Sequence, residues 1–197
     1  MTGLIILAAG ESSRLGQPKQ NLLFQGQTLL QGAVETALAS ACTPVIVVLG
    51  ANADKIIPIA NVNIIYNDDW QEGMASSIRI GVREMAKDAS VSNIVIMLCD
   101  QPFVDVGLLN SIITTQHQTG KSIVACAYNE TTGPPVLFNE VWFAELLSLQ
   151  GHEGAKKIIN THPEHRATIA FEQGSIDIDT QADYEEIVKQ AHLPGLL

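Results

Sequence analysis

The chain has 197 residues, of which 46% are apolar and 16% charged, a composition typical of a globular protein with a sizeable core. Its formal net charge of −10 argues against a nucleic-acid polymer as partner, because binding a phosphate backbone needs a positive surface. No apolar run approaches the length that spans a bilayer, and the N-terminus lacks the pattern of a secretion signal. We therefore expect no membrane partner. The three scattered cysteines, Cys42, Cys99 and Cys126, are typical of free thiols in a reducing compartment, which predicts a cytoplasmic location.

Four apolar runs recur in the first half of the chain without alternating in polarity: Leu4–Ala8, Val45–Leu49, Val62–Tyr66 and Ile94–Leu98. Strands that are apolar on both faces are typical of a parallel sheet covered by helices on both sides. Apolar residues at helical spacing lie around these runs, in the stretches 29–38, 78–85 and 108–113, and Thr28 is placed to cap the first of them. The alternation predicts an α/β fold: three layers with a doubly wound, mostly parallel sheet and right-handed crossovers.

The second half is less regular, and its expected elements are a strand over 123–128, a loop over 129–135, extended chain over 136–138, helices over 141–149 and 154–160, a strand over 167–171 and a helix over 182–191. Residues 192–197 contain a proline and a glycine, and we expect them to fray. No linker or internal repeat interrupts the chain.

The first apolar run leads directly into Leu7-Ala8-Ala9-Gly10-Glu11-Ser12-Ser13-Arg14-Leu15-Gly16-Gln17-Pro18-Lys19. Small residues let the backbone approach a ligand, and free backbone N–H groups with two cations suit a phosphate. A dinucleotide fingerprint needs a second glycine two positions after Gly10, and that glycine is missing. A P-loop needs its lysine directly after the second glycine, which is not so here. The other interpretation is a Gly/Ser turn with surface cations.

The spacing Leu-x-Ala-Gly-x-Ser-x-Arg-x-Gly-x-x-Lys over residues 7–19 resembles the opening motif of nucleotidyltransferases with a glycosyltransferase-A-like, nucleotide-diphospho-sugar transferase-like fold. Further segments resemble the same group of enzymes: Asn67 to Ile78, Leu98 to Pro102, Gly133 to Phe138, Gly151 to Lys156 and Asp177 to Asp183. Through these segments the chain resembles the MobA-like NTP transferase family, and within it the molybdenum cofactor cytidylyltransferases.

This resemblance implies a single domain over 1–197, with a nucleotide-binding half over about 1–104 and an acceptor-binding half over about 105–197. It implies transfer of the cytidylyl group of CTP to a phosphate-bearing pterin acceptor, with Mg²⁺ as cofactor. A molybdoenzyme or its maturation chaperone would be a further partner. The alternatives are a guanylyl- or sugar-phosphate nucleotidyltransferase of the same fold, a nicotinamide-dependent oxidoreductase, and a non-catalytic nucleotide-binding module.

Two carboxylates are candidate metal ligands. Asp100 follows the fourth apolar run, and open α/β sheets bind ligands at the carboxyl ends of their strands. It is either a Mg²⁺ ligand or a turn cap bonded to backbone N–H groups, and the resemblance favours the metal. The resemblance also makes Asp179 the second ligand, whose other interpretation is a helix N-cap. Whether Asp177 shares the metal stays open, and Asp183 is expected as a first-turn helix charge.

Arg14 and Lys19 are expected to hold the triphosphate and to act with Asp100 in catalysis, unless they are solvated surface cations. Leu7, Ala8, Ala9 and Gly10 are expected to face the base and ribose through their backbone. The methyl group of Ala9 favours a pyrimidine over a purine, by about 1–3 kcal/mol.

The resemblance assigns Ser77 to the cytosine and Gly73 to a close backbone approach, whereas entry into a helix is their other interpretation. His152 stands where the similar Gly-Asp-x-Gly-Ala-Arg element has an acidic residue, and Lys156 replaces its arginine. These departures leave the identity of the acceptor open.

Overall fold

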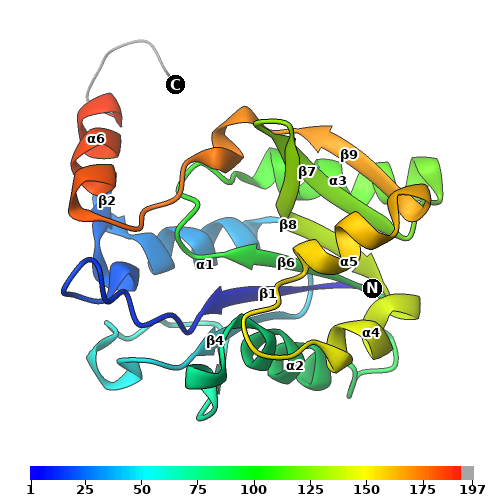
Figure 1. Cartoon of the computed structure of the whole chain (residues 1–197), viewed down its shortest axis with the longest axis horizontal. Helices are drawn as coiled ribbons and strands as arrows, with labels where there is room; N and C mark the ends of the chain where they lie inside the picture. Colours follow the sequence, from blue (N-terminus) through cyan, green and yellow to red (C-terminus); the bar gives the residue numbers. More distant parts are fainter. Residues whose placement is uncertain (192–197) are drawn as a thin grey trace.

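The computed structural model describes residues 1–191, and the expected fraying of 192–197 lies outside them. Seven strands form one sheet in the order β5-β4-β1-β6-β8-β7-β9, with helices on both faces (Figure 1). The strands of this sheet are β1 (Thr2–Ala8), β4 (Val45–Leu49), β5 (Asn63–Tyr66), β6 (Asn93–Leu98), β7 (Ile123–Tyr128), β8 (Thr131–Asn139) and β9 (Arg166–Ala170). The helices are α1 (Leu29–Ala39), α2 (Met74–Met85), α3 (Val106–Thr119), α4 (Phe143–Ser148), α5 (Lys156–Thr161) and α6 (Gln181–Ala191). A two-stranded hairpin, β2 (Leu23–Phe24) with β3 (Gln27–Thr28), precedes α1.

The strands of the first half run parallel, and their carboxyl ends meet at one edge of the sheet. Leu7 near the end of β1 pairs with Val48 of β4 on one side and with Leu98 of β6 on the other. In the second half, β8 is antiparallel to both β6 and β7, while β9 is again parallel to β7. The expected α/β architecture with a mostly parallel sheet is confirmed, with β8 as its antiparallel strand.

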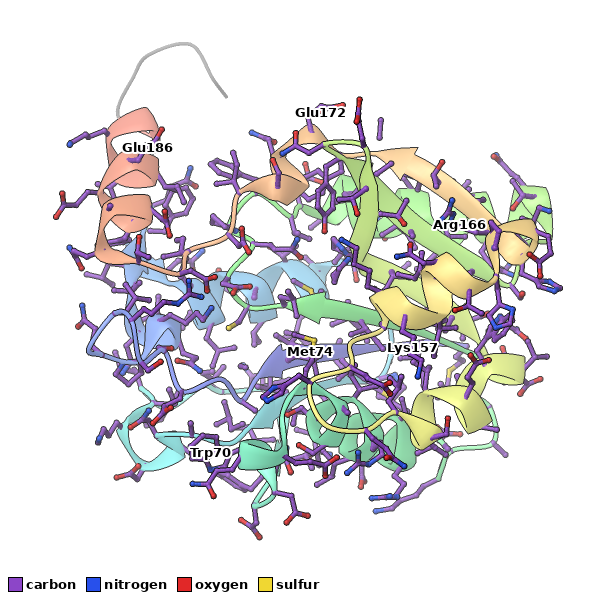
Figure 2. All side chains as sticks on the ribbon, in the orientation of Figure 1. Trp70, Met74, Lys157, Arg166, Glu172 and Glu186 are labelled. Carbon is purple, nitrogen blue, oxygen red and sulfur yellow. The ribbon has the colours of Figure 1, made fainter. Side chains whose placement is uncertain are left out.

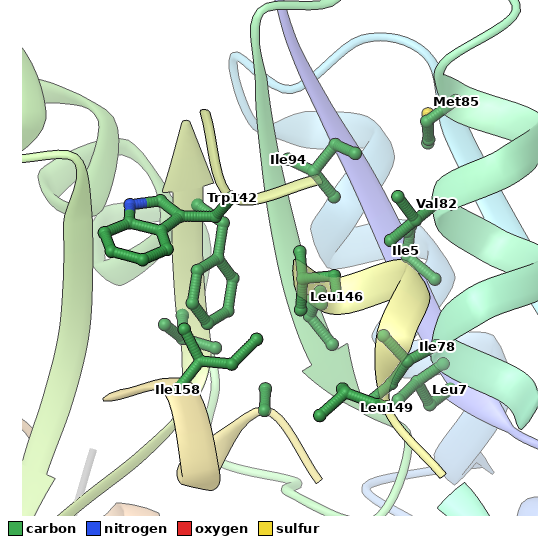
Figure 3. Close-up of a cluster of buried hydrophobic side chains, with 14 of the residues drawn as sticks. Ile5, Leu7, Ile78, Val82, Met85, Ile94, Trp142, Leu146, Leu149 and Ile158 are labelled. Carbon is green, nitrogen blue, oxygen red and sulfur yellow. The ribbon is translucent and has the colours of Figure 1, made fainter. Parts of the chain in front are cut away.

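Alternate side chains of β1 enter two separate cores, as expected for strands that are apolar on both faces. Leu4 and Ile6 pack with α1 and α3, whereas Ile5 and Leu7 pack with α2, α4 and α5. Figure 3 shows the second core, in which Ile78, Val82 and Met85 of α2 face the sheet, with Leu146 and Leu149 toward them and Trp142 on the other side of the cluster. The run at β5 differs, because β5 is an edge strand and its side chains are only partly buried.

The start of α1 follows the predicted cap. The Thr28 hydroxyl oxygen accepts from the backbone N–H of Gln31 at 3.1 Å, and the Gln31 side chain accepts from the Thr28 N–H at 3.0 Å. This reciprocal capping box satisfies two N–H groups that the helix itself leaves unbonded. None of the helices within residues 1–191 is long and apolar enough to cross a membrane.

The prediction of a loop over 129–135 is wrong for most of that range. β8 already begins at Thr131, and the connection from β7 is a tight turn whose residues Asn129 and Glu130 have φ of 45° and 58°. The pairing of β7 with β8 shifts register after Ala125, so that Pro134 and Pro135 fall in a bulge and pair with no residue of β6 or β7. Because prolines usually end a strand, the sequence did not predict that β8 continues through Pro134 and Pro135 by means of this bulge.

A third, small core joins α6 to the loop after β1. Ile178 and Ile187 pack against Leu15, Leu22 and Phe24. The Tyr184 hydroxyl donates to the Leu23 carbonyl at 2.8 Å. Figure 1 shows α6 beside β2, outside the helices that cover the sheet. This core brings the segment 177–180 onto the loop that carries Arg14 and Lys19.

Ile178→Ala is expected to lower the free energy of unfolding by about 2–5 kcal/mol, because the side chain is fully buried and its loss leaves a cavity. Ile57→Ala, at a side chain that is 44% exposed, is the matched control and is expected to cost less than about 1 kcal/mol. Urea unfolding of both variants measures the difference. Equal losses of unfolding free energy in the two variants would contradict the burial of Ile178 in the third core.

Candidate active site

A cleft of about 470 Å³ opens at the sheet edge where the carboxyl ends of β1, β4 and β6 meet. Its walls come from the end of β1 and the following loop, from the turn after β6, and from the segment that leads into α2. Trp70 and Met74, labelled in Figure 2, line it on the α2 side. The position agrees with the rule that open α/β sheets bind ligands beyond the carboxyl ends of their strands.

Eight of the nine residues expected to bind a nucleotide line this cleft: Leu7, Ala8, Ala9, Gly10, Lys19, Gly73, Ser77 and Asp100. The ninth, Arg14, lies in a neighbouring groove together with Asp177 and Asp179. The structure therefore brings the predicted set to one edge of the sheet, in two adjoining depressions. Their role in binding stays a prediction.

Lys19 joins three segments that are far apart in the sequence. Its Nζ donates to Oδ2 of Asp100 at 2.6 Å and to Oδ1 of Asp179 at 3.1 Å. Arg14 Nη2 donates to the other oxygen of Asp179 at 2.7 Å. The Lys19 and Asp100 side chains are only 14% and 12% exposed, whereas that of Arg14 is 66% exposed. The Lys19–Asp100 pair is therefore the costly one to break, and the exposed Arg14–Asp179 pair contributes little to stability.

Burial and charge act on these groups in opposite directions. Burial lowers the pKa of Lys19, but the charge and the hydrogen bond of Asp100 outweigh it, so the pKa lies above its ordinary value. Burial raises the pKa of Asp179. The hydrogen bonds and charges of Lys19 and then Arg14 outweigh this effect, so the pKa lies below its ordinary value. The pKa of Asp177 is raised by burial and by the charges of Asp100 and Asp179. Negative charge is thus in excess around one lysine, which favours a further cation.

One carboxylate oxygen of Asp100 has no hydrogen-bond partner among the described residues. Within residues 1–191, no group hydrogen-bonds its buried Oδ1, and no backbone N–H donates to its carboxylate. The turn-cap interpretation of Asp100 is therefore wrong. A buried carboxylate oxygen without a donor is costly, and hard divalent cations such as Mg²⁺ take such oxygens as ligands.

A cation here would need more ligands than the His, Cys, Asp and Glu side chains of residues 1–191 supply. No three His, Cys, Asp or Glu side chains of the described part of the chain come together closely enough to hold a metal by themselves. Two carboxylates with substrate phosphates are a usual environment for Mg²⁺. Asp100 and Asp179 fit this requirement, provided that Lys19 moves away from one of them.

Asp179 is not the cap of the last helix. The Asp183 carboxylate accepts from the backbone N–H groups of Asp179 and Thr180 at 3.2 and 2.8 Å, and the Thr180 hydroxyl accepts from the N–H of Asp183. Thr180 and Asp183 cap α6, as expected for a first-turn carboxylate at Asp183. The Asp179 side chain is thereby left to bind Lys19 and Arg14.

Sequence reasoning missed three buried amides that shape the site. Gln20 donates to the carbonyls of Ala8 and Gly10 at 2.7 and 3.3 Å and fixes the end of β1. Asn67 donates to the hydroxyls of Ser76 and Ser77 at 2.8 and 3.0 Å and orients the first turn of α2. The third amide, that of Gln101, donates to the carbonyls of Pro134 and Gly174. The only available signal was a polar residue directly beside a motif residue, which also describes many surface positions.

The three cysteines are free and buried, as expected. Cys99 directly precedes Asp100 and lines the cleft. Burial and then the neighbouring Asp100 raise the pKa of the Cys99 thiol to about 12. Because the thiolate is the reactive form, this pKa argues against Cys99 as a nucleophile at neutral pH.

Comparison with known proteins covers most of the chain. Residues 4–167 match the model of the MobA-like NTP transferase domain. The chain is 37% identical over 140 residues to nicotine blue oxidoreductase of Paenarthrobacter nicotinovorans, which covers 68% of this chain and 65% of that protein. It is 28% identical to purine catabolism protein PucB of Bacillus subtilis over 93% of this chain and 94% of that protein. It is 22% identical to molybdenum cofactor cytidylyltransferase of Escherichia coli over 91% and 92%.

Solved structures agree with this assignment. The crystal structure of Rv0371c from Mycobacterium tuberculosis H37Rv has a TM-score of 0.83 and 28% identity, over 95% of this chain and 97% of that one. A complex of Rv0371C with manganese has a TM-score of 0.79 and 25% identity, over 95% and 98%. A family match from residue 4 to residue 167, on a fold shared along nearly the whole chain, shows that this protein belongs to the nucleotidyltransferases of the MobA-like NTP transferase family.

Proposed function

We propose that the protein transfers the cytidylyl group of CTP to the phosphate of molybdopterin and releases pyrophosphate. The observation that carries the proposal is Lys19, held between Asp100 and Asp179 beside a cleft whose wall is the small-residue segment after β1. A cation beside two carboxylates suits a metal–triphosphate complex. The choice of CTP and of a pterin acceptor is supported by the relative in Escherichia coli that bears the name molybdenum cofactor cytidylyltransferase.

Ser77 supports a cytosine at the α2 end of the cleft. Its hydroxyl oxygen accepts from the Asn67 amide, which leaves the hydroxyl hydrogen to be donated to a ligand. Cytosine can accept such a hydrogen bond at O2 or N3, beside its own N4 amino donor. The Ala9 methyl is a weaker argument, because Ala9 is only 7% exposed and its Cβ lies 2.9 Å from where a Cβ on Gly50 would be. Only a small part of Ala9 is left to face a base.

The reaction is an in-line displacement in which a phosphate oxygen of the acceptor attacks the α-phosphorus of CTP and pyrophosphate leaves. The acceptor phosphate is already ionised, so no side chain has to remove a proton. Lys19 places a positive charge beside the leaving pyrophosphate, and Arg14 extends this charge toward the neighbouring groove. Asp100 and Asp179 would hold Mg²⁺, which supplies Lewis-acid stabilisation of phosphate charge when bound.

A nicotinamide-dependent oxidoreductase is the rival from another class, favoured by the name of the relative in Paenarthrobacter nicotinovorans. In a dinucleotide-binding fold, the pyrophosphate lies at the N-terminus of the helix that directly follows the first strand. Here residues 9–28, including the β2–β3 hairpin, separate β1 from α1. The chain therefore lacks this arrangement as well as the second glycine. Stabilisation against heat by NADPH and not by CTP with Mg²⁺ would favour the rival.

With Mg²⁺ and a molybdopterin acceptor, pyrophosphate release is expected to be at least about tenfold faster with CTP than with GTP, ATP or UTP, a discrimination of about 1.4 kcal/mol. The expectation rests on the name of the Escherichia coli relative, with the Ser77 hydroxyl as a donor to O2 or N3 of cytosine. A pyrophosphate-coupled assay with each nucleotide measures the preference. Release with GTP alone would replace the proposal by a guanylyltransferase, and release only with a sugar phosphate as acceptor would replace the pterin.

Asp100→Asn is expected to lower turnover by roughly 10²–10³-fold, because it removes the charge that holds Lys19 and the cation while keeping the shape of the side chain. Asp54→Asn, at an exposed carboxylate outside the cleft, is the matched control and is expected to keep normal turnover. Steady-state rates with CTP give the comparison. Near-normal turnover in Asp100→Asn would remove Asp100 from the site.

Metal binding is expected to depend on the nucleotide, because Lys19 lies between the two carboxylates that would hold the cation. Free protein should bind Mn²⁺ at least about tenfold more weakly than protein with CTP, and Lys19→Met should bind Mn²⁺ more tightly without nucleotide while losing turnover. Electron paramagnetic resonance of unbound Mn²⁺ measures both. Lys55→Met, at an exposed lysine, is the control, and equal Mn²⁺ affinity with and without CTP would refute the dependence.

A further inference from the structure

One side chain from the second half of the chain reaches the cleft. Within the described residues, every lining residue belongs to the first 104 positions except His152. His152 lies in the segment between α4 and α5. It joins the expected acceptor half to the expected nucleotide site at the α2 end, as Asp179 does at the Lys19 end.

An ion pair holds this segment in place. Arg79 of α2 donates both Nη atoms to the Glu72 carboxylate, one of them at 2.7 Å, and it also donates to the Leu149 carbonyl at 2.7 Å. Glu72 in turn accepts from the backbone N–H of Gly151 at 3.1 Å. Ala75 completes the contact by donating its N–H to the Gly151 carbonyl at 3.2 Å. Bidentate arginine–carboxylate pairs fix geometry as well as charge, so the segment 149–152 is docked on the first turn of α2.

The absence of a side chain at Gly73 makes room for this docking. A Cβ on Gly73 would lie 2.8 Å from Nδ1 of His152, and closer still to the carbonyl of Gly151. Gly73 also has φ of 122°, which other residues rarely adopt. Beside it, Met74 is 44% exposed, and a Cβ on Gly154 would lie 3.1 Å from its sulfur. The imidazole thus packs on the backbone at the start of α2.

The imidazole has hydrogen-bonding capacity to spare. No group of residues 1–191 hydrogen-bonds its ring nitrogens. A neutral imidazole offers one donor and one acceptor, which suits hydroxyl groups and the edge of a base better than a row of phosphates. Lys19, paired with Asp100, marks the phosphate end of the cleft, whereas His152 contacts Gly73 at the start of the helix that carries Ser77.

We propose that His152 is a substrate-contacting residue that hydrogen-bonds the nucleoside portion of the bound nucleotide from the second half of the chain. Glu72 and Arg79 are its positioning residues. This proposal rests on the nucleotidyltransferase reaction proposed above. It assigns the triphosphate to Lys19 and the nucleoside to a wall built from Ser77 and His152.

Isothermal titration of CTP, dCTP and inorganic triphosphate, each with Mg²⁺, tests the assignment. His152→Ala is expected to weaken CTP about tenfold and to leave inorganic triphosphate unchanged, while His152→Asn, which keeps a polar group near the Nδ1 position, recovers most of the loss. His117→Ala, on α3 and outside the cleft, is the matched control and should bind all three ligands normally. If the loss seen with CTP vanishes with dCTP, the contact is to the ribose 2′-hydroxyl; if it persists, the contact is to another part of the nucleoside.

Unchanged CTP affinity in His152→Ala would overturn the assignment, and so would an equal loss for inorganic triphosphate. Failure of the wild-type protein to bind any nucleoside triphosphate would instead overturn the proposed function, so the two failures are distinguishable. Thermal melting verifies that each variant is folded, and His152→Asn and His152→Gln carry the test if His152→Ala is not. Arg79→Lys should weaken CTP in the wild-type background and have no further effect in His152→Ala, as expected for a residue that acts through His152.

Discussion

A lysine ammonium shared by two carboxylates is the interaction on which the rest of the site depends. Lys19 is nearly buried, and a buried ammonium is costly unless anions compensate it. Asp100 does so from the end of a central strand, and Asp179 does so from the segment before α6. Removing either partner leaves charge uncompensated, because within residues 1–191 Arg14 is the only other Lys or Arg that lines the two depressions. The third core brings the long loop and the C-terminal segment together, and the ion pairs then join both to the end of the central sheet.

The cleft has two ends with different physical character. The end at Lys19 is organised by charge, and its carboxylates outnumber its cations. The end at α2 is organised by hydrogen bonds between neutral groups and by close backbone packing, with Asn67 orienting Ser77 and Gly73 lying under His152. A nucleoside triphosphate has the same polarity along its length, with a charged tail and a neutral head. Because carboxylates are in excess at the Lys19 end, an anionic tail would bind there together with a divalent cation, which fits a chain of net charge −10.

The sheet could be predicted from the sequence wherever apolar runs were uninterrupted. The strands β4 and β7 have the bounds that their runs predicted, because a buried central strand needs apolar side chains on both faces. The start of β8 could not be predicted, because Pro134 and Pro135 usually end a strand and the bulge that accommodates them forms only in the folded sheet. The partial exposure of β5 could not be predicted either, since an edge position depends on strand order rather than on composition.

Within the site, the position of Asp100 could be predicted from the apolar run Ile94–Leu98, because ligands bind at the carboxyl ends of parallel strands in this kind of fold. The residues that contact it could not be predicted from the sequence. That Lys19 bonds Asp179 depends on the third core, and that His152 enters the cleft depends on an ion pair between Glu72 and Arg79 far from it in sequence. Contacts of this kind arise from tertiary packing, and no local pattern encodes them.

The small core beneath α6 has a consequence for the order in which the protein opens. The core beneath α6 has far fewer buried side chains than either core of the sheet, so we expect the segment 177–191 to be among the least stable parts of the molecule. Asp179 lies in that segment, whereas Asp100 and Lys19 are tied to the end of the sheet. Local opening there would withdraw one carboxylate while the strands keep their hydrogen bonds. A ligand that binds both carboxylates would then suppress this opening, so occupancy of the cleft and order of the C-terminal segment are thermodynamically linked.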